Sequence, residues 1–243
     1  MHIVNSLFSK EYDFAASTAP RLELMIATLP RAGSTYFCIE LWKTGLLGAP
    51  LEYANFGLAK VMRERLPGIE DPVEYWRQVQ RLRTGGNGVF SYKMFMNMYL
   101  DHGRQSPAML KRFAPDKVVY LTRRDKVAQA ISYSRAIKSK SWFAGTATKV
   151  EPEYDPAHVR MSERSIHRQE RFWEKVFQLT ETTVLPVVYE DFLENPDAVK
   201  ARICEWTGQT IDPGKYLDIP NLSRQADETS AAWTRRYLQD RQP

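Results

Sequence analysis

Residues 22–35 read LELMIATLPRAGST, and this stretch decides the fold class of the chain. The apolar run at 22–29 is closed by Pro30 and Gly33, which predicts a short buried strand followed by a tight loop. A helical pattern follows at 35–47. A strand that passes through a short loop into a helix is typical of α/β proteins, which bind anions at such loops.

Strand and helix patterns alternate along the rest of the chain. This order predicts a mostly parallel, three-layer α/β sheet in a single domain covering residues 1–243. Pro186 falls inside the last predicted strand and favours an edge position or a short pairing register for it. Further strands are predicted at 89–94, 117–122 and 183–189, helices at 57–66, 72–83, 107–113, 126–142, 157–180, 195–208 and 231–238, and a long loop at 143–156.

The composition is that of an ordinary globular protein, with 43% hydrophobic and 26% charged residues. It excludes collagen-like, low-complexity and largely disordered chains. Two cysteines and four scattered histidines show no metal-ligand spacing, so we expect no metal site.

The charge and the hydropathy pattern narrow the possible partners. There is no apolar run of the ~18 residues that a membrane span requires and no basic, apolar leader, so we expect a cytoplasmic protein. The 34 Lys and Arg residues exceed the 29 Asp and Glu residues, giving a net charge of +5. A basic balance leaves nucleic acid, an anionic surface and a phosphorylated small molecule open as partners.

The loop after the first strand has the chemistry of an anion site. Gly33 lets the backbone approach a ligand, Ser34 and Thr35 add hydroxyl groups, and Arg31 adds a permanently charged fork. A plain turn with a hydroxyl cap explains the same spacing. The loop lacks the second glycine and the lysine of a Walker A sequence.

A second basic stretch, LTRRD at 121–125, follows the third predicted strand. Arg123 at the strand tip and Ser132 on the next helix are candidates for a second phosphate site, because parallel strands bring their carboxyl ends together. A solvated basic turn is the alternative interpretation.

The order of several motifs is more specific than any one of them. The chain resembles bacterial sulfotransferases of the trehalose 2-sulfotransferase type, which are related to the Nod-factor and lipopolysaccharide sulfotransferases. The motifs that carry this resemblance are PRAGST at 30–35, GAPLEY at 48–53, SYKMF at 91–95, LTRRDKVAQAISYSRA at 121–136, VVYEDFLENP at 187–196 and RQADETSAAWTRRY at 224–237.

The resemblance implies a sulfotransferase fold with a P-loop-like phosphosulfate loop, no metal, and a homodimer. It implies 3′-phosphoadenosine 5′-phosphosulfate (PAPS) as the donor and a hydroxyl, often on a carbohydrate or glycolipid, as the acceptor. Matching the motifs implies that the 5′-phosphosulfate is bound by Arg31, Ala32, Gly33, Ser34 and Thr35, and the 3′-phosphate by Arg123 and Ser132. It also implies that Tyr189 lies near the adenine and that the nucleotide is covered by Arg224, Gln225, Trp233 and Arg236.

Three further roles follow from the resemblance and from the chemistry of sulfuryl transfer. Glu52 is expected to be the general base, and Arg31 to stabilise negative charge without donating a proton. Lys93 is a second cation at the site, a substrate ligand, or a lysine at a sheet edge. Ala32 stands where related loops often carry serine, which removes one hydroxyl.

Two other functions remain as alternatives. A non-catalytic module that binds nucleic acid or a phosphorylated ligand would use the same basic residues, and a divergent nucleotide kinase would use the same loop. A small donor with phosphates at both ends explains the arginine positions better than a polymer does, so we expect no nucleic-acid partner. The acceptor segments at 53–88 and 143–156 match no motif.

Overall fold

A four-stranded parallel sheet lies at the centre of the computed structural model, which describes residues 6–14, 19–105, 107–142, 152–212, 214–221 and 228–241. The strand order is β2-β1-β3-β4, and each neighbouring pair is parallel. The predicted α/β fold is therefore confirmed. The strands are β1 (Leu22–Thr28), β2 (Val89–Phe95), β3 (Lys117–Thr122) and β4 (Thr183–Val188).

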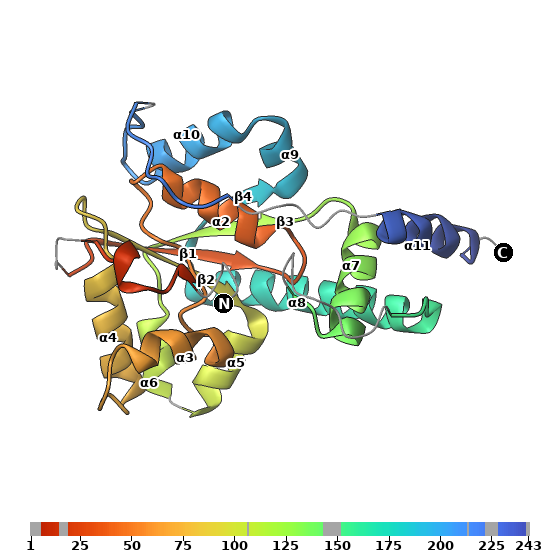
Figure 1. Ribbon diagram of the computed structural model, residues 1–243, viewed down its shortest axis with the longest axis horizontal. Coiled ribbons are helices and arrows are strands. Elements are labelled where there is room, and N and C mark those ends of the chain that lie inside the picture. The colour runs from red at the N-terminus through yellow and green to blue at the C-terminus, as the bar shows by residue number, and fades with distance from the viewer. Residues whose placement is uncertain are drawn as a thin grey trace.

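Helices cover both faces of the sheet (Figure 1). On one face lie α2 (Ser34–Lys43), α9 (Tyr189–Glu194) and α10 (Pro196–Trp206). On the other lie α3 (Phe56–Glu64), α4 (Pro72–Arg83), α5 (Met96–Gln105), α6 (Pro107–Arg112) and α8 (Pro156–Thr180). At one end of the molecule, α7 (Lys126–Ser139) packs with α8 and with α11 (Glu228–Gln239), and a short 3₁₀ helix, η1 (Lys10–Tyr12), lies near the N-terminus.

The apolar run of β1 is continuous because both faces of this strand are buried. Side chains alternate between the faces of a strand. Leu24 and Ile26 join the core beneath α2, whereas Met25 packs in the core that contains Trp76 of α4 and Trp173 of α8. The strand is thus held from both sides, and its carboxyl end is fixed in space.

Several predicted boundaries match the structure. The bounds of α4 and β3 agree with the prediction, and Asp125 caps α7 by accepting a 2.9 Å hydrogen bond from the Ala128 amide. Helix α2 ends earlier than the predicted Leu47. The Thr44 hydroxyl donates to the Leu41 carbonyl at 2.6 Å and Gly45 takes a φ of +69°, so the chain leaves the helix there.

The sequence missed two helices. Helix α5 begins at Met96 directly after β2, and α9 begins at Tyr189, which was expected to end a strand. The edge position indicated by Pro186 is confirmed, since β4 ends the strand order. Most of the predicted 143–156 loop, at 143–151, lies outside the described residues.

A buried arginine fastens the N-terminal segment 6–14 to α4. Arg83 is fully buried and donates hydrogen bonds to the carbonyls of Leu7 and Tyr12, both at 3.1 Å, and of Ser9 at 3.0 Å. Its Nε lies 3.2 Å from a carboxylate oxygen of Asp13. The segment is therefore an integral part of the helical layer that contains α4.

Among the helices in the described part of the chain, none combines the length and the apolar character that crossing a membrane requires.

Candidate active site

Most of the predicted site residues that the structure describes lie where three parallel strands end. Thr28, the last residue of β1, pairs with Phe95 of β2 and with Leu121 of β3. The loops that follow β1 and β3 therefore start side by side, as the sequence indicated, and the positive end of α2 lies at the same edge.

The loop after β1 has an unusual backbone. Arg31 and Gly33 both take left-handed conformations, with φ of +63° and +76°. Backbone amides in such a turn can converge on an anion. The amide of Ala32, which is fully buried, bonds the Leu29 carbonyl at 3.3 Å and is used within the loop. Gly33 then precedes the first turn of α2, which contains Ser34 and Thr35.

Tyr189 packs directly on this glycine. A β-carbon on Gly33 would fall within the van der Waals radius of the Tyr189 ring. Glycine is therefore required here for two reasons: the backbone is left-handed, and the Tyr189 ring leaves no room for a β-carbon. The contact also places Tyr189 beside the loop at 31–35.

Replacing Gly33 by alanine should destabilise the protein markedly. The left-handed backbone costs about 1–2 kcal/mol for alanine, and displacement of the Tyr189 ring adds to it. At about 2–4 °C per kcal/mol, the melting temperature should fall by more than about 4 °C. The matched control is Gly86→Ala, because Gly86 has no atom near its would-be β-carbon and no left-handed φ. Equal melting temperatures for the two variants would contradict the prediction.

Arg31 is a partly buried cation held by neutral acceptors. Its Nε donates to Ser132 Oγ at 2.9 Å and its Nη1 to the Trp142 carbonyl at 2.7 Å. Within the described residues it forms no ion pair with a carboxylate. Burial, followed by the positive charges of Arg123 and Arg135, lowers the pKa of Arg31 to about 10. Such a group is stabilised by a bound anion.

Arg123 lies next to the same loop. Its Nη1 donates to the Arg31 carbonyl at 3.4 Å, and its Nε is 3.6 Å from Glu190 Oε1. This buried Nε–H makes no hydrogen bond to any described residue, so it has capacity for a ligand. The neighbouring Arg124 is different, because it is exposed and pairs with Asp191.

Arg135 is a site residue that the sequence analysis missed. It follows Ser132 by three positions and so lies on the same face of α7. Its Nη1 donates to Ser230 Oγ at 2.6 Å, and its guanidinium carbon is 5.9 Å from the ring centre of Trp233 in α11. We call Arg31, Arg123 and Arg135 the arginine cluster. The helical spacing from Ser132 was the signal that could have revealed its third member.

The C-terminal residues are only partly placed. Trp233 is buried beside the arginine cluster. Arg236 stacks over the ring of Tyr154 at 4.4 Å, and no contact among the described residues joins it to the cluster. Arg224 and Gln225 lie outside the described residues.

Glu52 and Lys93 form a buried ion pair at the end of the loop at 31–35. Lys93 Nζ is 2.8 Å from Glu52 Oε1 and donates to Thr35 Oγ1 at 3.0 Å. Both side chains are buried. Leu51 pairs with Tyr92 and accepts a hydrogen bond from the Lys93 amide at 2.9 Å, which brings Glu52 to this position. Lys93 is on an edge strand but is not a solvated lysine.

Asn55 is another residue that the sequence did not single out. Its Nδ2 donates to Glu52 Oε2 at 2.7 Å. No repeated pattern in the sequence marks this contact. The described part of the chain contains no group of three or more His, Cys, Asp or Glu side chains arranged to hold a metal ion.

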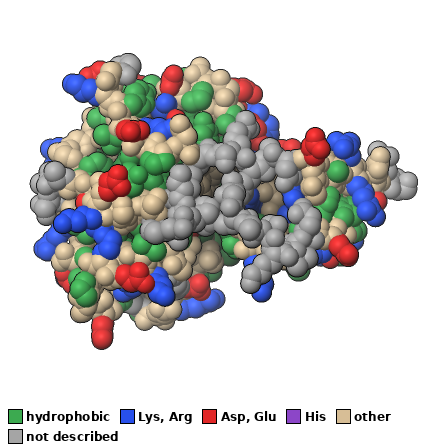
Figure 2. Space-filling model, viewed as in Figure 1, with side chains coloured by type: hydrophobic (Ala, Val, Ile, Leu, Met, Phe, Trp, Pro, Cys, Tyr) green, Lys and Arg blue, Asp and Glu red, His purple; other side chains and the backbone are tan. Residues whose placement is uncertain are grey.

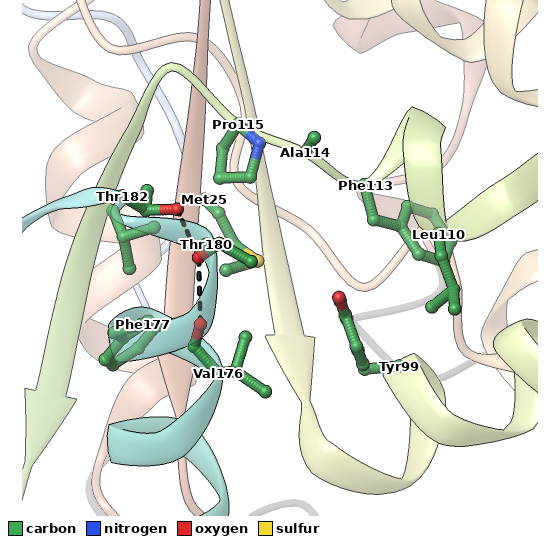
Figure 3. A pocket seen from close by; sticks show the side chains of 11 residues that line it. Met25, Tyr99, Leu110, Phe113, Ala114, Pro115, Val176, Phe177, Thr180 and Thr182 are labelled. Carbon is green, nitrogen blue, oxygen red and sulfur yellow. Dashed lines mark hydrogen bonds between the residues drawn. The ribbon is translucent and has the colours of Figure 1, made fainter.

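A separate cavity lies away from these residues (Figure 3). Its volume is about 170 Å³, and it opens near the amino ends of β3 and β4, between α5, α6 and the end of α8. Tyr99, Phe113 and Val176 line it, and the Thr180 hydroxyl bonds the Val176 carbonyl at 2.9 Å. None of the predicted site residues contributes to this cavity.

Residues 23–240 match the family model described as Stf0 sulphotransferase. The chain is 28% identical to a trehalose 2-sulfotransferase of Mycobacterium tuberculosis (strain ATCC 35801 / TMC 107 / Erdman), over 91% of this chain and 96% of that protein. It is 26% identical to one of Mycolicibacterium smegmatis, over 93% and 97% of the two chains. A sulfotransferase domain from the curacin biosynthetic pathway shares the fold, with a TM-score of 0.50 and 17% identity over 89% of this chain and 83% of that one.

Proposed function

The chain belongs to the Stf0 sulphotransferase family and transfers a sulfuryl group, and from this premise we propose that PAPS is its donor and a carbohydrate hydroxyl its acceptor. The trehalose 2-sulfotransferases among its relatives support a carbohydrate acceptor. The homodimer and the cytoplasmic location implied by the sequence remain predictions.

The arginine cluster supports a donor with anionic groups at both ends. Three guanidinium groups meet here, and Glu190 is the one carboxylate that a described contact brings to them. The loop at 31–35 and the Arg31 side chain would hold the 5′-phosphosulfate, and Arg123 with Ser132 the 3′-phosphate. Tyr189 would contact the adenine, and Trp233, Arg236 and the two residues outside the described part, Arg224 and Gln225, would close over the nucleotide.

One observation carries the catalytic assignment. We call the loop at 31–35 the donor loop. The Lys93 ammonium contacts Thr35 on this loop and Glu52 on the neighbouring segment. The carboxylate is therefore fixed beside the end of the loop where the sulfuryl group would lie. A general base must come within about 2.6–3.2 Å of the acceptor hydroxyl, and we assign this role to Glu52 because of its position beside the loop.

The other cations would stabilise charge rather than move protons. PAPS supplies an activated sulfuryl group whose departure leaves negative charge on the 5′-phosphate. Arg31 stays protonated at neutral pH, since its pKa of about 10 is well above 7. It would act by electrostatic stabilisation, which is the largest catalytic effect in many transfer enzymes. Lys93 would hold Glu52 and contribute a second positive charge.

A thermal-shift comparison tests the donor. The product nucleotide 3′-phosphoadenosine 5′-phosphate, at ~100 times its dissociation constant, adds about 2.7 kcal/mol of stability. The melting temperature should rise by about 5–10 °C, whereas ATP and a short oligonucleotide should have little effect. No rise with the 3′-phosphorylated nucleotide would contradict the proposal. A rise with ATP alone would favour a kinase, and one with the oligonucleotide alone a nucleic-acid-binding protein.

The distribution of charge on one face of the molecule favours a small ligand over a nucleic acid. On the face seen in Figure 2, the Lys and Arg side chains of the described residues are interspersed with acidic and apolar ones and form no continuous basic band. A polymeric nucleic acid requires an extended basic surface. Radiolabelled donor offered with a panel of hydroxylated glycans, trehalose included, would identify the acceptor.

A further inference from the structure

Asn55 contacts two features that lie on opposite sides of its side chain. Its Oδ1 accepts hydrogen bonds from the Gly57 and Leu58 amides, at 3.0 and 3.4 Å, and so caps α3. Its Nδ2 donates to Glu52 Oε2 at 2.7 Å. The first turn of α3 is thereby connected to the carboxylate of Glu52.

The orientation of the amide follows from both neighbours. With the oxygen and nitrogen exchanged, the carbonyl oxygen would face a carboxylate oxygen and the NH₂ group would face two backbone N–H groups. Either arrangement of like groups is repulsive. The cap therefore fixes the direction in which Nδ2 donates.

Each oxygen of Glu52 consequently has its own donor. Lys93 contacts Oε1 at 2.8 Å, and Asn55 donates to Oε2. A carboxylate has about four acceptor positions, so two such contacts fix its plane and still leave room for a third donor, such as an acceptor hydroxyl.

We propose that Asn55 is a positioning residue for the transfer reaction: its side-chain amide holds the carboxylate of Glu52 in the plane that receives the acceptor proton. This inference rests on the proposed role of Glu52 as the general base. Helix capping alone does not explain Asn55, because Ser, Thr and Asp cap helices about as well without an amide donor.

Two other titratable groups interact with Glu52. Lys93 from β2 pairs with Glu52, and Cys38 of α2 interacts with it electrostatically, whereas His102 of α5 bonds the Ala54 carbonyl at 2.8 Å. Burial raises the pKa of Cys38 to about 12, and burial lowers the pKa of His102. The Cys38 thiol thus stays neutral through the working pH range. In the variant Asn55→Asp, the new carboxylate is therefore the charge that is added next to Glu52.

The test compares two variants that keep the cap. Asn55→Ser removes the donor to Glu52, and kcat should fall about 10-fold or more through misorientation, with the melting temperature and the affinity for 3′-phosphoadenosine 5′-phosphate unchanged. Asn55→Asp places a second carboxylate against Glu52, so the acidic limb of the kcat–pH profile should move to higher pH. A residue that only caps α3 would leave kcat at the wild-type value in Asn55→Ser, whereas the shift in Asn55→Asp reports that position 55 lies against Glu52.

A remote cap gives the matched control. Asp71 caps α4 by accepting a 3.1 Å hydrogen bond from the Val73 amide, and Asp71→Ala should lower the melting temperature while leaving kcat unchanged. Wild-type kcat in Asn55→Ser would overturn the inference, whatever the pH profile of Asn55→Asp. Asn55→Thr replaces the serine variant if that one does not fold. Glu52→Gln distinguishes the role of Asn55 from the role of Glu52 as the general base. If Glu52→Gln is inactive while Asn55→Ser is normal, only the role of Asn55 is contradicted. If Glu52→Gln is active, both roles are contradicted.

Discussion

Glu52→Gln is expected to lower kcat by about 10²- to 10⁴-fold while binding of 3′-phosphoadenosine 5′-phosphate persists. Glutamine has nearly the same shape but cannot accept the acceptor proton. Glu52 is linked to the donor loop only through Lys93 in the described contacts and has none to the arginine cluster, so the nucleotide affinity, measured by calorimetry, should change little. Turnover at the wild-type rate would remove Glu52 from the mechanism.

The ion pair with Lys93 requires a second variant in the same experiment. Glu52→Gln leaves Lys93, which is 3% exposed, without its carboxylate, and breaking a buried pair in this way costs about 3–5 kcal/mol. Low activity could then reflect a loss of folded protein. Glu52→Gln combined with Lys93→Met removes the unpaired charge. This double variant should recover melting temperature relative to Glu52→Gln and still lack activity.

Arg31→Met should have the second largest effect, with kcat lower by about 10²- to 10³-fold and weaker nucleotide binding. The guanidinium is partly buried at the loop, where we propose that the leaving group lies. Arg31→Lys keeps the charge but cannot reach both Ser132 Oγ and the Trp142 carbonyl, so it should be intermediate. Single-turnover rates with saturating donor would separate transfer from binding.

Arg124→Met is the matched control for this experiment. Arg124 also follows the sheet edge, but its side chain is 60% exposed and pairs with Asp191. Loss of one exposed ion pair changes stability by about 1 kcal/mol or less. Equal kinetic losses in Arg124→Met and Arg31→Met would show that general positive charge, rather than the position of Arg31, governs the rate.

The sheet was predictable because its signals are local. β1 and β3 are apolar runs with clear ends, and α4 starts at an Asp-Pro cap that the structure reproduces. Helix α5 was missed because β2 runs into it at Met96 with no intervening glycine or proline. Helix α9 has only the six residues from Tyr189 to Glu194, too few to establish a helical period.

The site was predictable only where a motif marks it. Arg31, Ser132 and Arg123 come from motifs, and the structure brings them together. The contacts of Glu52 were not predictable in this way. Its bonds to Lys93 and Asn55 depend on the Leu51 bridge to β2 and on the cap of α3, and both arise from tertiary packing rather than from spacing along the chain.

The contacts of the buried Arg83 guanidinium extend the folded structure beyond the residues that the family model matches. The family match begins at residue 23, yet the carbonyl acceptors and the carboxylate that surround Arg83 all come from residues before it. A fragment cut at the family boundary would leave a buried cation in α4 with these partners removed, which is among the most costly defects a core can contain. The minimal piece of this chain suitable for expression or domain grafting therefore starts before Leu7.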